Sequence, residues 1–220
     1  MELGLKGKRV AILAADGVEP RELAEPKQAL EAAGATTQVV GPSGDAVTAK
    51  GGQAVHVDCT LAACHAADFD ALVVPGGDSP RRLAEEQRAI QLVREFMLAE
   101  KPVAAICDGT SLLLAADAVA GRNVTGATAL KGAVGEKGGT WVDLPVSVDD
   151  RLVTSRGDED LPHFTRAIVK EFANRIDEAR VDQTSEQSFP ASDPPPGPSA
   201  IGGEGVRLEK KRVDLLRMAG

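Results

Sequence analysis

Residues 102–110 read PVAAICDGT, and this short stretch decides the fold class of the chain. An apolar run of the kind found in buried parallel strands leads directly into Cys107, with Ala105 two residues before it and Gly109 two residues after it. A nucleophilic side chain spaced between small residues in this way is typical of a nucleophile elbow, a tight strand-to-helix turn. The thiol would face the positive end of the following helix, which favours the thiolate. The alternative interpretation is that Cys107 is an ordinary core residue, as many free cysteines are.

Strand and helix patterns alternate on both sides of this turn. Apolar runs predict strands at 9–14, 37–40, 71–74 and 102–106, with an edge strand or hairpin arm at 53–57 and a hairpin at 146–148 and 152–154. Helical spacing of apolar residues predicts helices at 22–33, 82–99, 109–116 and 161–176. We therefore predict an α/β fold, a flavodoxin-like three-layer sandwich with a mostly parallel sheet covered by helices on both faces. Functional residues are then expected at the carboxyl ends of the strands.

The composition excludes several classes of protein. The 220 residues are 43% hydrophobic but only 3% aromatic, so the core must be aliphatic, and the formal net charge of −8 argues against binding to nucleic-acid phosphates. No run approaches the 18 apolar residues of a membrane span, and residues 1–8 lack the apolar segment of a signal peptide. Three cysteines without scaffold spacing do not indicate a disulfide framework. We expect a cytoplasmic protein with no membrane partner and no specific nucleic-acid partner.

The composition changes near residue 180. Residues 182–205 are rich in Pro, Gly, Ser and Gln, and cannot bury enough apolar surface to offset the entropy lost on ordering. Residues 207–218 are basic with a few aliphatic side chains, a weak apolar pattern that is compatible with a short helix. We predict an α/β domain over 1–180 and a disordered tail over 181–220 that carries this short basic helix.

A glycine pair follows the predicted strand at 71–74. Backbone N–H groups of Gly76 and Gly77 at the carboxyl end of that strand are placed to hold an anion or a developing oxyanion. The segment is not a P-loop, because no Gly-Lys-Ser/Thr follows it, and no G-x-G-x-x-G follows the first strand. We therefore predict no cofactor. The alternative interpretation is an ordinary strand-to-helix turn.

The loop after the first strand supplies carboxyl groups. Glu19 would approach the Cys107 thiol if the two strands lie near each other. A carboxyl group in that position would have a raised pKa, and its proton would hydrogen-bond the sulfur. The alternative is that Glu19 and Glu22 are acidic residues of a first helical turn, favoured there by the helix dipole.

Four metal-ligating residue types occur within ten residues of one another, namely His56, Cys59, Cys64 and His65. Their spacing fits no ordinary zinc module, and His56 stands in an alternating strand pattern. We therefore predict no metal site.

Six segments carry a resemblance to a known family: 18–26 (VEPRELAEP), 68–77 (DFDALVVPGG), 102–109 (PVAAICDG), 141–143 (WVD), 152–156 (LVTSR) and 160–164 (DLPHF). In this order and context they resemble the PfpI family of the DJ/PfpI superfamily, in particular its bacterial general stress proteins. The resemblance extends roughly over residues 8–172. It implies the glutamine-amidotransferase-like fold of that superfamily, which agrees with the predicted α/β sandwich.

The resemblance also implies roles for particular residues. Cys107 matches the reactive cysteine, and Glu19 is matched to the acid that hydrogen-bonds it. Gly76, Gly77 and the backbone N–H of Asp108 match the expected oxyanion pocket. Members of the family mostly form homodimers or larger assemblies, so a homodimer or higher homo-oligomer is expected.

Two positions depart from the peptidase pattern within this family. The intracellular cysteine peptidases have histidine directly after the cysteine, where this chain has Asp108. The acidic residue that orients that histidine should fall near Arg81, which is basic, and residues 124–130 contain no histidine of the kind found in a related branch. The triad is therefore absent, and peptidase activity is disfavoured.

The resemblance implies a cysteine-dependent hydrolase or lyase of stress defence, similar to glyoxalases and deglycases. Its substrate would be a small carbonyl compound or a glycated protein or nucleotide. Cys107 would be the nucleophile, Glu19 the general acid and base, and Asp108 a candidate base. One alternative is a redox sensor or chaperone-like stress protein without turnover, in which Cys107 is oxidised. Another is hydration of a small carbon–nitrogen substrate, for which Asp16 is the candidate acid.

Overall fold

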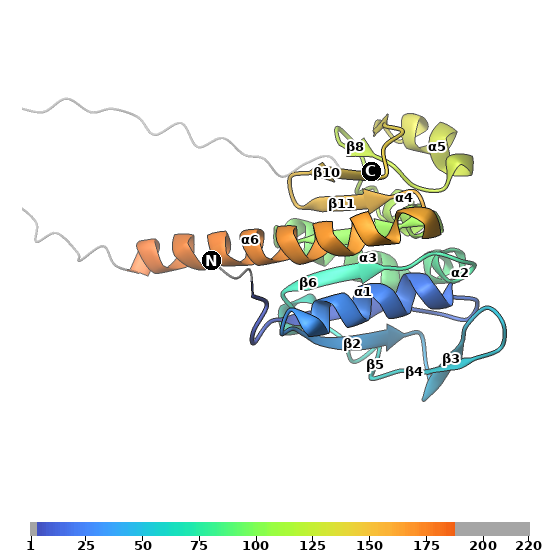
Figure 1. The fold of residues 1–220 in the computed structure, drawn as a ribbon, viewed down its shortest axis with the longest axis horizontal. Coiled ribbons are helices and arrows are strands. Elements are labelled where there is room, and N and C mark those ends of the chain that lie inside the picture. The colour runs from blue at the N-terminus through green and yellow to red at the C-terminus, as the bar shows by residue number, and fades with distance from the viewer. Residues whose placement is uncertain (1–3, 188–220) are drawn as a thin grey trace, which may run out of the picture.

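The computed structural model describes residues 4–187, and its centre is a seven-stranded sheet (Figure 1). The strands are β1 (Arg9–Leu13), β2 (Thr36–Gly41), β5 (Cys59–Thr60), β6 (Ala71–Val74), β7 (Val103–Ile106), β10 (Val146–Asp149) and β11 (Leu152–Ser155). They lie in the order β10-β11-β7-β6-β1-β2-β5, and every neighbouring pair is parallel except the β10–β11 hairpin. The predicted mostly parallel sheet is confirmed.

Helices cover both faces of this sheet. On one face α1 (Pro20–Ala32) packs beside α6 (Leu161–Gln187), and both lie in front of the strands in Figure 1. On the other face α3 (Gln87–Leu98) packs on β6 and β7, with α2 (Ser79–Glu85) and α4 (Thr110–Ala115) beside it. The three-layer arrangement explains why β6 and β7 are apolar at every position, since neither face of these central strands meets water.

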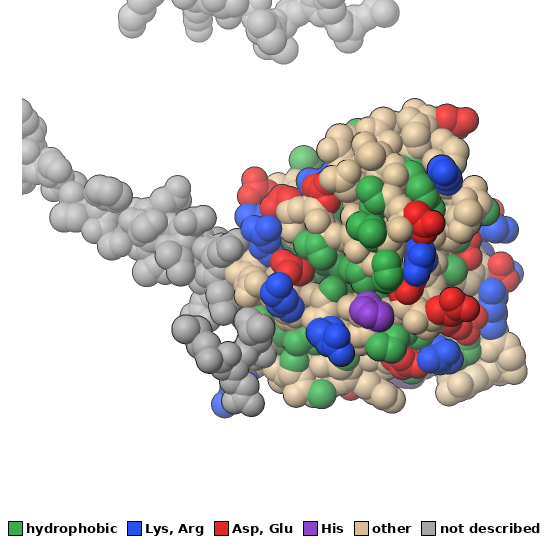
Figure 2. Space-filling model, turned by 45° about the horizontal axis from the view of Figure 1, so that its top comes forward, with side chains coloured by type: hydrophobic (Ala, Val, Ile, Leu, Met, Phe, Trp, Pro, Cys, Tyr) green, Lys and Arg blue, Asp and Glu red, His purple; other side chains and the backbone are tan. Residues whose placement is uncertain are grey.

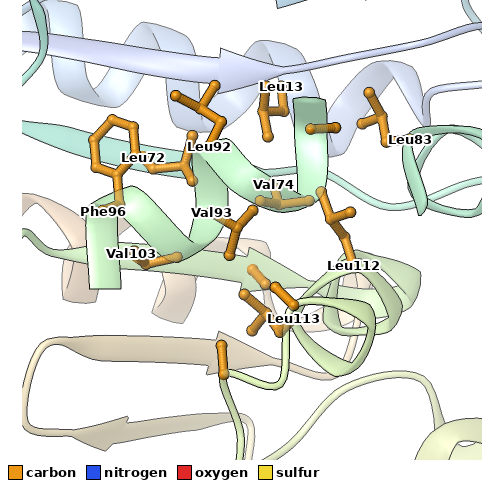
Figure 3. Packing of buried hydrophobic residues seen from close by; sticks show 14 of the residues in the cluster. Leu13, Leu72, Val74, Leu83, Leu92, Val93, Phe96, Val103, Leu112 and Leu113 are labelled. Atoms are coloured by element: carbon orange, nitrogen blue, oxygen red, sulfur yellow. The ribbon is translucent and has the colours of Figure 1, made fainter. Parts of the chain in front are cut away.

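Side chains of each strand alternate between two cores. In β6, Leu72 and Val74 join the core under α3 and α4, whereas Val73 joins the core under α1 and α6. Figure 3 shows the first core, where aliphatic side chains of the strands meet those of α3 and α4, with Phe96 as the one labelled aromatic ring. The aliphatic core expected from the low aromatic content is therefore present.

Smaller elements complete the described part of the chain. A hairpin of β3 (Ala46–Thr48) and β4 (Ala54–His56) confirms the hairpin arm predicted at 53–57. The pair β8 (Asn123–Val124) and β9 (Thr140–Trp141), with α5 (Lys131–Glu136) between them, was not predicted. Four short 3-10 helices are also described: η1 (Ala66–Asp68), η2 (Cys107–Gly109), η3 (Thr128–Leu130) and η4 (Asp158–Asp160).

Two helix predictions differ from the structure. The helix predicted at 82–99 is divided into α2 and α3, because Glu86 is extended at φ −95° and ψ 106°. The last helix extends to Gln187, which is seven residues beyond the predicted domain boundary at 180. The remainder of the predicted tail, 188–220, lies outside the described residues.

The surface is mixed in charge on the face that Figure 2 presents. Acidic and basic side chains alternate around a group of apolar ones, without an extended patch of one sign. Within residues 4–187, no helix is long and apolar enough to cross a membrane.

Candidate active site

The carboxyl ends of β1, β6 and β7 meet at one edge of the sheet, because β6 pairs with both of the other strands. The three loops singled out in the sequence follow these strands. β11 pairs with β7 on its other side, so the loop after β11 reaches the same edge. Cys107 is the first residue after β7. The loops after β1, β6 and β11 therefore end at the same edge of the sheet as Cys107.

Cys107 stands in a strained turn with the geometry of the predicted elbow. Its φ of +57° is in the left-handed region, which costs a non-glycine residue about 1–3 kcal/mol. The turn continues through η2 into α4, and a Cβ at Gly109 would lie 2.3 Å from the Val74 carbonyl oxygen. Only glycine at that position lets the turn pack against the end of β6.

Glu22 is the carboxyl group beside the thiol. It is only 2% exposed, and its Oε2 accepts a hydrogen bond of 2.8 Å from the Gly76 N–H. A Cβ at Gly76 would lie 2.4 Å from that oxygen and 2.9 Å from the Cys107 Cβ, so glycine is required between the two side chains. The Cys107 thiol and the Glu22 carboxyl are close enough for each to shift the pKa of the other.

The contact predicted for Glu19 is thus made by Glu22, which corrects the assignment. Glu19 is the N-cap of α1, makes no side-chain capping hydrogen bond, and contributes its backbone N–H to the Gly76 carbonyl at 3.2 Å. Glu22 lies one turn before Pro26 on the face of α1 that is buried against the sheet. Glu22 is an acidic residue of the first turn of α1, as the alternative interpretation held, but its side chain is buried beside the turn that carries Cys107.

Burial governs the protonation of the pair. Desolvation raises the pKa of Glu22 to about 8, the Gly76 N–H opposes this rise, and the charge of Asp158 adds to it. Burial likewise raises the pKa of Cys107 to about 12, with further increases from the carboxyl groups of Glu22 and Asp108. At neutral pH the resting site therefore holds a thiol beside a protonated carboxylic acid, and not the thiolate expected from the helix end alone.

Asp108 contributes two groups at the sulfur. The Cys107 thiol faces its Oδ2 at 3.7 Å, and its backbone N–H hydrogen-bonds the sulfur and lowers the pKa of Cys107. Of the predicted oxyanion donors, the Gly76 N–H donates to Glu22, whereas the bridge between Gly77 and Val18 uses the N–H groups of Glu19 and Asp78 and not that of Gly77. The Asp108 N–H is the donor that the structure places directly at Cys107.

The loop after β11 reaches the site but was not predicted to do so. A Cβ at Gly157 would lie 3.6 Å from the Cys107 sulfur and 4.0 Å from Glu22 Oε1. The next residue, Asp158, acts on Glu22 and raises the pKa of its carboxyl group. No local pattern marks this loop as part of a site, because its approach depends on the pairing of β11 with β7.

The contacts of the other candidates are with residues other than Cys107. Asp16 Oδ1 accepts the Thr48 N–H at 2.7 Å, which ties the first loop to the β3–β4 hairpin. Cys64 is buried and His56 faces Asp58 at 3.9 Å. Across the described part of the chain, no group of three or more His, Cys, Asp or Glu side chains is arranged to hold a metal ion.

Comparison with known proteins identifies the family. The model of the DJ-1/PfpI family matches residues 8–171. General stress protein 18 of Bacillus subtilis is 40% identical over 163 residues, which are 73% of this chain and 95% of that protein. A protein of Staphylococcus epidermidis described as uncharacterized is 40% identical over 166 residues, which are 74% of this chain and 96% of that protein.

Solved structures agree with this assignment. A two-domain protein of Anabaena variabilis with DJ-1/ThiJ/PfpI-like and ferritin-like domains matches with a TM-score of 0.72 and 34% identity, over 74% of this chain. This chain spans about half of that longer protein, since the match covers 47% of it. A ThiJ/PfpI domain protein of Brachyspira murdochii matches in fold with a TM-score of 0.72 at 24% identity, over 77% of this chain and 98% of the other.

Proposed function

Because the chain belongs to the DJ-1/PfpI family, we propose that it is a stress-defence enzyme that acts on small reactive carbonyl compounds or glycated groups through Cys107 and Glu22. The observation that carries this proposal is the buried Glu22 carboxyl, which is protonated at neutral pH and in contact with the thiol of a strained elbow. The likeness to General stress protein 18 supports the stress-related role.

The first step is addition of the thiol to an aldehyde. The sulfur–carbon bond forms as the carbonyl π bond breaks, and the thiol proton passes to the Asp108 carboxylate that it faces. Glu22 donates its proton to the carbonyl oxygen. The product is a neutral hemithioacetal, with Asp108 protonated and Glu22 ionised.

An α-oxoaldehyde can then rearrange without an external oxidant. The Glu22 carboxylate removes the proton from the former aldehyde carbon, and Asp108 protonates the neighbouring carbonyl oxygen to give an enediol. Glu22 returns its proton to that neighbouring carbon, and Asp108 takes the proton of the remaining hydroxyl, which leaves a thioester on Cys107. Water adds to the thioester with loss of a proton to Glu22, and Asp108 protonates the departing sulfur. An α-hydroxy acid leaves, and all three side chains regain their starting protonation.

Methylglyoxal is the probe that tests this proposal. Wild-type protein and a Cys59→Ser control should form lactate over many turnovers, observed by proton NMR, whereas Cys107→Ser should lose at least about a hundredfold in rate. Cys59 is the matched control because it is a half-buried free thiol outside the site. The proposal fails if the wild-type protein forms no lactate above the buffer rate, or if Cys107→Ser forms it equally fast.

A redox sensor without turnover is the second candidate, because a protonated Glu22 can donate a hydrogen bond to an oxidised Cys107 sulfur as well as to a carbonyl oxygen. A sensor would be modified once by hydrogen peroxide and would not consume methylglyoxal catalytically. A peptidase is not proposed, because the side chains acting on the Cys107 thiol are carboxyl groups and Asp108 stands where the peptidase pattern has histidine.

The proposal includes a small-molecule carbonyl as the partner, a cytoplasmic location and a homodimer or larger homo-oligomer. Light scattering of the purified full chain measures the last of these. A monomer at all concentrations tested would contradict it.

A further inference from the structure

One polar atom at the site has no apparent partner. Asp158 Oδ1 is buried, and no N–H or hydroxyl group of the described residues donates a hydrogen bond to it. Buried polar atoms are nearly always paired, so such an atom in a site requires an explanation. Asp158 follows Gly157, the residue packed against the Cys107 sulfur and Glu22 Oε1, and it begins η4.

The group that faces Asp158 is also a carboxyl. Oε2 of Glu22 is occupied by the Gly76 N–H, which leaves Oε1 on the side of Gly157 and Asp158. Asp158 acts on Glu22 through both its charge and a side-chain hydrogen bond. Two carboxyl groups can hydrogen-bond each other only when one of them carries a proton.

The remaining charges around the pair do not remove this requirement. Cys107 and Asp108 approach from η2, and both are acidic groups. From α1, the Arg21 guanidinium feels the charges of Glu19 and Asp158 but is exposed and hydrogen-bonded to Glu25. The local excess of negative charge therefore favours retention of a proton.

We propose that Glu22 and Asp158 form a carboxyl pair sharing one proton, with Glu22 as the protonated member and Asp158 as the positioning residue that keeps it so. Glu22 is almost completely buried whereas Asp158 is half-buried, so the negative charge costs less on Asp158. Asp158 thereby sets the pH range over which Cys107 has a proton donor beside it. The inference rests on the proposed function for its catalytic meaning, but the protonation of the pair is measurable without substrate.

The test is a carbon-13 NMR titration of the full chain labelled at glutamate side-chain carboxyls, with the Glu22 signal assigned by its loss in Glu22→Gln. The wild-type Glu22 signal should titrate near pH 8. Asp158→Asn removes the like charge and offers an amide N–H to ionised Glu22, so the Glu22 titration should move down by about 1–3 pH units. Asp158→Glu restores a carboxyl group and should return the titration towards the wild-type value.

Glu159→Gln is the matched control, because Glu159 is the exposed neighbour of Asp158 in η4 and should leave the titration unchanged. A Glu22 titration in Asp158→Asn equal to that of the wild type overturns the proposal. If Asp158→Asn does not fold, a titration near the ordinary glutamate value in the wild type or in Asp158→Glu overturns it equally. Absence of lactate formation by a wild-type protein whose Glu22 titrates near pH 8 would instead contradict the proposed function and leave the pair intact.

Discussion

Glu22 shows how a single residue departs from its pattern for a functional reason. It lies four residues before Pro26 and eight before Leu30, so the three share one face of α1, and all three are buried. A carboxyl group on a buried helical stripe is costly unless it is hydrogen-bonded or protonated, and Glu22 is both. The stripe was visible in the sequence, and it was the signal that distinguishes Glu22 from Glu19.

The substitutions Glu22→Gln and Glu19→Gln separate the roles of these two acidic residues. Glu22→Gln should slow lactate formation from methylglyoxal by about a hundredfold or more, because glutamine cannot donate and recover a proton. Glu19→Gln should stay within about twofold of the wild type, since the carboxyl groups that act on the thiol are those of Glu22 and Asp108. Rates are measured at pH 7 with matched protein concentrations, and the reverse order of effects would restore Glu19 as the acid.

At the scale of elements, the elbow depends on the close packing of β6 against the turn after β7. Cys107 is held at positive φ, and Gly109 has no space for a side chain. The local pattern around Cys107 was enough to predict this turn because all its requirements fall within a few adjacent residues. The break at Glu86 was not predictable in the same way, because no glycine or proline marks it and it reflects how α2 packs on α4 while α3 packs on the sheet.

The substitution Gly109→Ala tests the close packing of this turn against β6. Gly109→Ala should lower the free energy of unfolding by about 1–3 kcal/mol or more, because the Cβ would lie 2.3 Å from a carbonyl oxygen and the backbone must shift. Gly132→Ala in α5 is the control, since its Cβ meets nothing within 4 Å and alanine favours a helix by up to about 1 kcal/mol. Urea unfolding measures both variants, and equal stability of the two would contradict the packing of the elbow.

At the scale of the whole molecule, the raised pKa of Glu22 couples the site to global stability. Folding takes this carboxyl from an ordinary pKa of 4.5 to about 8, so the folded state binds its proton more tightly than the unfolded state does. The contribution of Glu22 to the free energy of unfolding is fully present below about pH 4.5 and is lost as the pH rises through about 8. The site is thus destabilised at alkaline pH by the same burial that keeps its acid protonated.

The pH dependence of unfolding measures this coupling. The free energy of unfolding of the wild type, relative to Glu22→Gln, should fall by a few kcal/mol (on the order of the pKa shift at about 1.4 kcal/mol per unit) between pH 5 and pH 8. Urea titrations should end near pH 8.5, so that ionisation of the Cys107 thiol does not contribute. Parallel curves for the two proteins would show that Glu22 does not carry a shifted pKa.

The sequence by itself determined the alternating strands and helices, the mostly parallel sheet and the elbow at Cys107, because each depends on the order of polar and apolar residues over short distances. It could not decide which carboxyl groups surround the thiol. Glu22 enters the site through the rotation of α1 on the sheet, and Asp158 enters because β11 lies beside β7. Only the tertiary structure brings these residues together, since a proton shared between groups 136 positions apart is a property of packing and not of local pattern.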